Sequence, residues 1–207
     1  MKELVYVIAL VVMAMSNQKV NIEDIVKTSV QQEEKVELGS FFSFFDGTQF
    51  YYYESDKESF EIVLNLLREL PENVKIGVAE VHFEGKNGNV AGSTSGTTIT
   101  LYDFLSYDKE TQKHILYHEV AHTYRNVLWS KNLIDADYEV YAEAVKKDRN
   151  YLSEYSKGKI KDENNYAEDF ADGFSEYFRN YKSFKRKCKN RFEYLDKLIK
   201  EDYENGK

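Results

Sequence analysis

The segment between Asp108 and Ser130 contains neither glycine nor proline, the two residues that most readily interrupt a helix. Its central part contains the apolar residues Ile115, Leu116, Val120 and Ala121. We therefore predict a single long helix over residues 107–129, with much of its surface buried. A helix of this length needs other elements to cover it, which constrains the rest of the fold.

Most of the remaining chain also has helical patterns. An amphipathic pattern predicts a helix over residues 57–70, and Pro71, the only proline, ends it. After the long helix we predict further helices over residues 136–155, 164–181 and 184–202. The polar, glycine-containing residues 157–165 are predicted to form a loop.

A small amount of β-structure is expected before the long helix. Alternating residues predict a strand over 74–83, and the β-branched run TTITLY predicts another over 97–102. The glycine-rich residues 84–96 between them are typical of a loop. Aromatic runs on both sides of Asp46-Gly47 predict a β-hairpin over residues 41–53. This order of elements indicates an α+β domain.

The N-terminus has the pattern of an export signal. Lys2 precedes the apolar run Leu4 to Met15, and small residues follow it. We predict a signal peptide over residues 1–16 and a single domain over residues 17–207, beginning with a surface helix over 17–38. The run is too short to span a bilayer comfortably, so no stable membrane insertion is expected after its removal. The alternative is a buried N-terminal helix or strand.

Charge and cysteine content exclude some classes of function. The formal net charge is −8, which argues against nucleic acid as a partner because nucleic-acid-binding proteins present basic faces. Cys188 is the only cysteine, so neither an intrachain disulfide nor a zinc finger built on several cysteines is possible. We expect Cys188 to be a small buried residue.

The long helix contains the motif His118-Glu119-Val120-Ala121-His122. Residues four apart lie on the same face of a helix, so the two imidazoles can reach one zinc ion. Glu119 adjoins the first histidine and can act as general base toward a water molecule. His114 lies one turn earlier, too far to join the other two on one ion, and is predicted to be a core or rim histidine. The alternative is a buried helix with incidental polar residues.

A third ligand is expected in the segment from Tyr166 to Phe174. Glu168 and Asp172 are four residues apart, beside apolar neighbours, so both carboxylates can point inward on one helical face. We predict Glu168 as the third zinc ligand and Asp172 as a hydrogen-bond acceptor for a ligating imidazole. The alternative is that these acids belong to a solvated surface.

These motifs resemble those of known metallopeptidases. HExxH followed by a helical ExxxD pattern resembles the gluzincins. The segment NNYAEDFADGFSEYFRN looks like the third-ligand helix of the anthrax lethal factor and Pro-Pro endopeptidase family, and KNRFEYLDKLI is similar to its closing helix. The resemblance covers about residues 107–200. It implies a zincin-like domain with a small mixed β-sheet, and an active-site helix followed by a helical C-terminal half.

Carried over to this sequence, the resemblance implies His118, His122 and Glu168 as zinc ligands and Glu119 as base. That family also uses a tyrosine before the third ligand to stabilise the oxyanion. Its usual spacing falls on Lys161 here, so Tyr155 is the best candidate, with Tyr151 and Tyr166 behind it. Ala121 replaces the family's usual glycine. The resemblance also implies that the 97–102 strand has a free edge beside the metal for an extended peptide, with Gly92 and Gly96 allowing close approach.

We therefore expect a secreted bacterial zinc endopeptidase that acts on a protein or peptide substrate, and a monomer. Within enzymes, the alternative is a gluzincin of another family with a different specificity. Outside enzymes, the alternatives are a catalytically silent zincin-fold binding domain and a secreted structural protein without metal.

Overall fold

The computed structural model describes residues 38–42, 49–53, 56–134, 138–163 and 165–205. The predicted signal peptide, the predicted surface helix over most of 17–38 and the Asp46-Gly47 turn lie outside these residues. The strands are β1 (Leu38–Phe42), β2 (Gln49–Tyr53), β3 (Glu80–Glu84), β4 (Gly92–Ser95) and β5 (Thr98–Tyr102). The helices are α2 (Lys57–Arg68), α3 (Glu72–Lys75), the 3-10 helix η2 (Phe104–Ser106), α4 (Lys109–Ser130), α5 (Glu139–Asp148), α6 (Glu154–Glu163), α7 (Ala167–Arg179), α8 (Tyr181–Lys187) and α9 (Lys189–Asn205).

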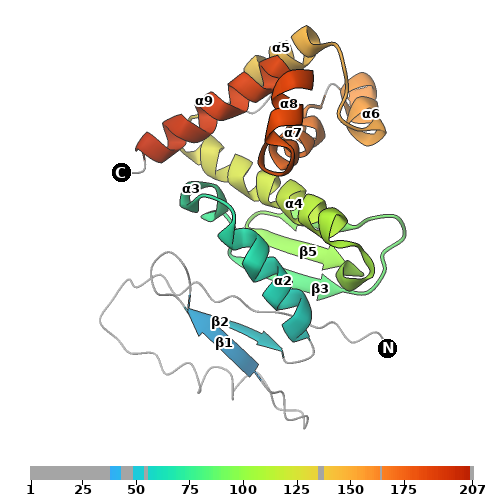
Figure 1. The fold of residues 1–207 in the computed structure, drawn as a ribbon, viewed down its shortest axis with the longest axis vertical. Helices are drawn as coiled ribbons and strands as arrows, with labels where there is room; N and C mark the ends of the chain where they lie inside the picture. The colour runs from blue at the N-terminus through green and yellow to red at the C-terminus, as the bar shows by residue number, and fades with distance from the viewer. Residues whose placement is uncertain (1–37, 43–48, 54–55, 135–137, 164, 206–207) are drawn as a thin grey trace.

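The α4 helix lies at the centre of the molecule, with the three-stranded sheet on one side and the C-terminal helices on the other (Figure 1). Asp108 caps its first turn by accepting a hydrogen bond from the Thr111 N–H at 3.0 Å. The predicted long helix is confirmed. The mixed α+β class, mostly helical with a small sheet, is also confirmed.

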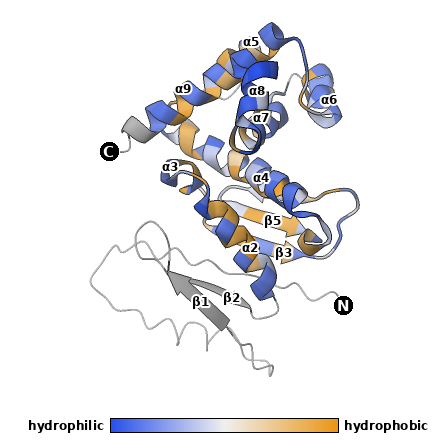
Figure 2. Ribbon diagram, in the orientation of Figure 1, coloured by the Kyte–Doolittle hydropathy of each residue, from blue (hydrophilic) through white to orange (hydrophobic). Residues whose placement is uncertain are grey.

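The sheet has the order β3-β5-β4, in which β3 runs parallel and β4 antiparallel to β5. Ile99 and Leu101 of β5 are fully buried. Figure 2 shows the hydrophobic character of β5, in contrast to the mostly hydrophilic α8. β1 and β2 form the predicted antiparallel pair. None of the described helices combines the length and apolarity needed to cross a lipid bilayer.

Three predictions about the strands are corrected by the structure. The strand predicted over 74–83 begins only at Glu80, because residues 72–75 form the short helix α3. The predicted loop 84–96 contains β4, which was missed because its residues are small and polar and one of its faces is exposed. The predicted free edge of the 97–102 strand is also wrong, since β5 has a neighbour on each side. Among the described strands of this sheet, β3 and β4 are the edge strands, and β4 lies in contact with α4.

The segment between α4 and α7 also differs from the prediction of one helix over 136–155. Arg149 takes a left-handed conformation with φ of 57° and ends α5 at Asp148. A second helix, α6, occupies most of the predicted 157–165 loop. It lacks an apolar stripe and is held by polar contacts such as the Lys159–Glu163 ion pair at 2.7 Å, so hydrophobic periodicity could not reveal it.

Candidate metal centre

The polar face of α4 meets the polar face of α7 in a ladder of side-chain contacts. His118 Nδ1 lies 3.0 Å from Asp172 Oδ1, and His118 Nε2 lies 3.1 Å from Glu168 Oε2. One turn further along α4, His122 Nε2 lies 3.7 Å from the same Glu168 oxygen. Residues later in α4 contact residues earlier in α7, so the two helices run antiparallel. The four-residue spacing of the histidines matches that of the two carboxylates.

Three of these side chains form a group that could hold a metal ion. The Nε2 atoms of His118 and His122 are 3.2 Å apart, and each faces Glu168 Oε2. Bond lengths of 2.0–2.1 Å in a tetrahedral zinc site separate its ligands by about 3.3 Å. The three separations of 3.1, 3.2 and 3.7 Å fit that geometry. The sequence-predicted ligands are thus brought together, with one side open to the cleft.

Asp172 sets the orientation and protonation of the first imidazole. A neutral His118 that donates its Nδ1 proton to Asp172 presents a lone pair at Nε2, as a metal ligand requires. Burial lowers the pKa of His118, but hydrogen bonds to Asp172 and Glu168 outweigh it and raise the pKa to about 10. Burial likewise opposes ionisation of Glu168, yet its contacts with the two histidines hold its pKa well below the usual range. The centre of this group therefore favours positive charge, whether a proton or a metal ion.

His114 is brought to the same face but is engaged elsewhere. Its Nδ1 lies 3.0 Å from the Ser175 hydroxyl, and burial lowers its pKa. His114 also lies close to His118 and Asp172, but the His118 Nδ1–Asp172 contact already joins those two side chains. This arrangement agrees with its prediction as a satisfied histidine at the rim of the site.

Glu119 lies against the edge strand of the sheet. Its side chain is only 6% exposed, and its Oε2 accepts a hydrogen bond of 2.7 Å from the Thr94 hydroxyl. A Cβ at Gly92 would stand 2.7 Å from Glu119 Oε1, so only glycine lets β4 approach this closely. Gly92 therefore accommodates the carboxylate, whereas the sequence suggested a role in approach to the substrate. Gly96 has φ of 62° and occupies the first position of the two-residue turn between β4 and β5.

A cleft of about 1770 Å³ opens over the metal-ligand group. β4 and the residues before it form one wall, α4 forms the floor, and α5, α6 and the start of α7 form the other wall. Tyr155 lines this cleft and is 62% exposed, and its hydroxyl makes no hydrogen bond with the described residues. Tyr166 also lines it but is buried, whereas Tyr151 is not among its lining residues. Lys161, where the family's usual spacing would place the tyrosine, is not a lining residue either, and its ammonium group lies 5.8 Å from the centre of the Tyr151 ring.

Two contacts of the site were missed by sequence reasoning. Thr94 holds Glu119, and Ser153 donates a hydrogen bond of 2.6 Å to Asp172 Oδ2. Neither residue type is distinctive, since serine and threonine are common in loops. Ser153 carried one usable signal, because it is followed three residues later by Ser156 at the start of a helix.

Neither the models of known protein families nor the curated proteins match this sequence.

Proposed function

We propose that this protein is a zinc-dependent endopeptidase that hydrolyses peptide bonds in extended segments of protein substrates. The single observation that carries the proposal is the convergence of His118, His122 and Glu168, with Glu119 beside them at the floor of an open cleft. Two histidines and a carboxylate leave one position for water or substrate, which is the ligand set of catalytic zinc sites. The apolar N-terminal segment supports export as part of this proposal.

Zinc held by these three ligands would polarise the scissile carbonyl and lower the pKa of a water molecule. Glu119 takes the proton from the attacking water and later gives it to the leaving amine. Thr94 donates to Glu119 Oε2 and so fixes the orientation of the carboxylate. Asp172 keeps His118 in the tautomer that binds metal.

In the described part of the chain, β4 has no strand neighbour on the side away from β5, which supports binding of an extended substrate there. The Tyr102 N–H donates to the Ala91 carbonyl at 3.0 Å, so alternate residues from Ala91 onward direct their backbone toward β5. Gly92 and Thr94 fall between them, and their N–H and C=O groups point away from β5. Both residues line the cleft, where a peptide can add as a further strand.

The proposal is tested by incubating the purified protein with a proline-rich and a mixed peptide library, and identifying the products by mass spectrometry. We expect internal cleavage that a zinc chelator abolishes and added zinc restores. The Glu119→Gln protein, purified in the same way, controls for contaminating peptidases. A folded, zinc-loaded protein that cleaves neither library would contradict the proposal.

Tyr155→Phe tests the oxyanion donor. The phenol is exposed in the cleft wall, so its hydroxyl can donate a hydrogen bond to the oxyanion that forms on the scissile carbonyl. We expect kcat to fall about a hundredfold with little change in KM or zinc content, because the contact forms mainly in the transition state. Tyr166→Phe and Tyr151→Phe are the matched variants. If Tyr155→Phe keeps a near-normal kcat and the kcat of Tyr166→Phe falls about a hundredfold, Tyr166 is the oxyanion donor.

A further inference from the structure

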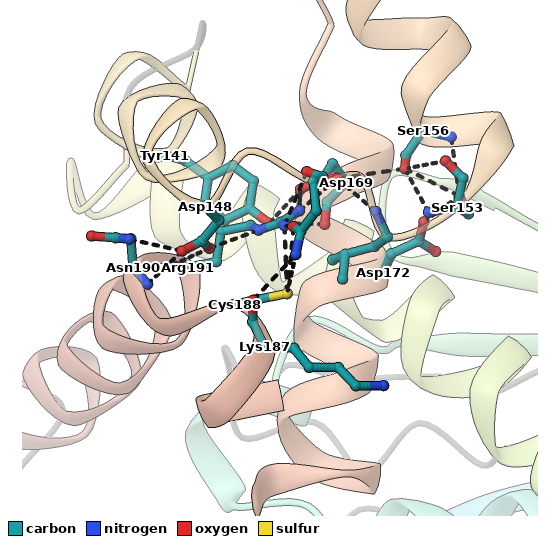
Figure 3. A network of polar contacts seen from close by, with 12 residues as sticks. Tyr141, Asp148, Ser153, Ser156, Asp169, Asp172, Lys187, Cys188, Asn190 and Arg191 are labelled. Carbon is teal, nitrogen blue, oxygen red and sulfur yellow. Dashed lines mark hydrogen bonds and ion pairs between the residues drawn. The ribbon is translucent and has the colours of Figure 1, made fainter. Parts of the chain in front are cut away.

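A fully buried arginine, Arg191, joins helices α5, α7 and α9 through a network of polar contacts (Figure 3). Arg191 of α9 donates to both carboxylate oxygens of Asp169 on α7, at 2.7 and 2.9 Å. Its Nε donates to Asp148 at the end of α5, at 3.1 Å. Its remaining nitrogen donates to the backbone carbonyl of Asn150, at 3.1 Å, and to the Asn150 side chain. One side chain thus fixes α5, α7, α9 and the segment that leads into α6.

Asp169 immediately follows Glu168 in α7 but lies in a different environment. Asp169 is fully buried with Arg191 and Tyr141, whereas Glu168 and Asp172 contact the histidines of α4. The N-terminal half of α7 is therefore held on two faces. The Asp169–Arg191 ion pair fixes the helix against α9, and this sets the position of Glu168 and Asp172, which face α4.

Ser153 connects this cluster to the candidate metal centre. It stands just before α6, where its Oγ accepts from the Ser156 N–H at 3.1 Å and its N–H donates to Ser156 Oγ at 3.2 Å. Its hydroxyl lies 3.1 Å from Ser156 Oγ and 2.6 Å from Asp172 Oδ2, and the nearer, charged carboxylate is the stronger acceptor for its proton. Asp172 then turns its other oxygen, Oδ1, toward His118 Nδ1.

We propose that Ser153 is a positioning residue for the metal site and that the Arg191 cluster holds it there. This inference rests on the proposed function. Arg191 fixes the backbone of Asn150, and with it the short segment that ends at Ser153. Ser153 then prevents rotation of the Asp172 carboxylate, so that His118 keeps its Nδ1–H donated to Asp172 and its Nε2 lone pair directed at the ligand position. Neither Ser153 nor Arg191 touches the metal.

The test measures the zinc dissociation constant of folded protein by chelator competition, the visible spectrum of the cobalt-substituted protein and the melting temperature of the metal-free form. We expect Ser153→Ala to raise the zinc dissociation constant about 10-fold, the lower end of the range for residues that hydrogen-bond a ligand directly, because Ser153 acts through Asp172, and to shift the cobalt bands. Ser153→Thr keeps the hydroxyl and the helix cap, so its affinity should remain within about threefold of wild type.

Asp108→Ala is the matched control. It removes a capping bond of the same kind from α4, away from the metal-ligand group, and should lower the melting temperature without changing zinc affinity. Equal zinc affinities and cobalt spectra in Ser153→Ala and wild type would overturn the inference while leaving the proposed function intact. A wild-type protein that binds no zinc would overturn both.

A double-mutant cycle tests whether Arg191 acts through Ser153. Arg191→Lys keeps a positive charge beside Asp169 but loses the guanidinium group, whose separate nitrogens contact Asp169 and Asn150 at the same time. We expect it to weaken zinc binding several-fold in the wild-type background and by less than about twofold in Ser153→Ala, because coupled residues are not additive. If Arg191→Lys does not fold, Asn150→Ala takes its place in the cycle. Additive effects would contradict the link from the cluster to Ser153.

Discussion

Glu119→Gln is expected to lower kcat by several hundredfold or more while leaving zinc bound, in line with the loss of a general base. Glutamine has nearly the same shape as glutamate and its carbonyl oxygen can accept the Thr94 hydrogen bond, so the close packing of β4 against α4 is retained. What is lost is the ability to take a proton from water. The measurement is kcat and KM on the best peptide from the libraries, together with zinc content.

Glu143→Gln is the matched control for this variant. Glu143 also lines the cleft, but it is paired with Lys146 at 2.8 Å on the exposed surface of α5. We expect its turnover to stay close to that of wild type. If Glu119→Gln loses its zinc, Glu119 is a ligand and the assignment of a base is wrong. If it retains both zinc and turnover, Glu119 is not the base.

Glu168→Ala is expected to weaken zinc binding by more than about a hundredfold, beyond the range found for residues that only orient a ligand. The change removes the oxygen that faces both histidines and leaves the site with two protein ligands. Zinc affinity is measured by chelator competition on protein whose circular dichroism shows that it is folded. Turnover should be lost at zinc concentrations that saturate the wild type.

Two neighbouring acids provide the comparison. Glu163 of α6 pairs with Lys159, and Glu176 of α7 accepts bonds from Arg179 and Asn180. Neither contacts the histidines, so Glu163→Ala and Glu176→Ala should keep the wild-type zinc affinity. Equal affinities in all three variants would mean that Glu168 belongs to a solvated acidic surface and is no ligand.

The parts of the site that could be predicted from the sequence are those encoded within single helices. His118 and His122 share a face because they are four residues apart, and the same spacing places Glu168 and Asp172 together on α7. The structure added the pairing of those two faces. The contacts between these histidines and carboxylates depend on how α4 packs against α7. The periodicity within each helix carries no information about that packing.

The parts that could not be predicted depend on tertiary contacts. The β4 strand has no hydrophobic alternation, and its approach to α4 depends on the close contact between Gly92 and Glu119. Arg191 would be assigned to the surface by its type, since arginine is seldom buried without partners. Its burial follows from partners on separate segments, including Asp148 and Asp169, that only the folded chain brings together.

The zinc content of the purified protein tests the central claim most directly. Elemental analysis is performed on protein prepared without added metal, before and after dialysis against zinc. Three ligands that converge from α4 and α7 predict about one equivalent of zinc per chain, removed by a chelator and restored by dialysis. Less than about a tenth of an equivalent in folded protein, not restored by zinc, would contradict the account.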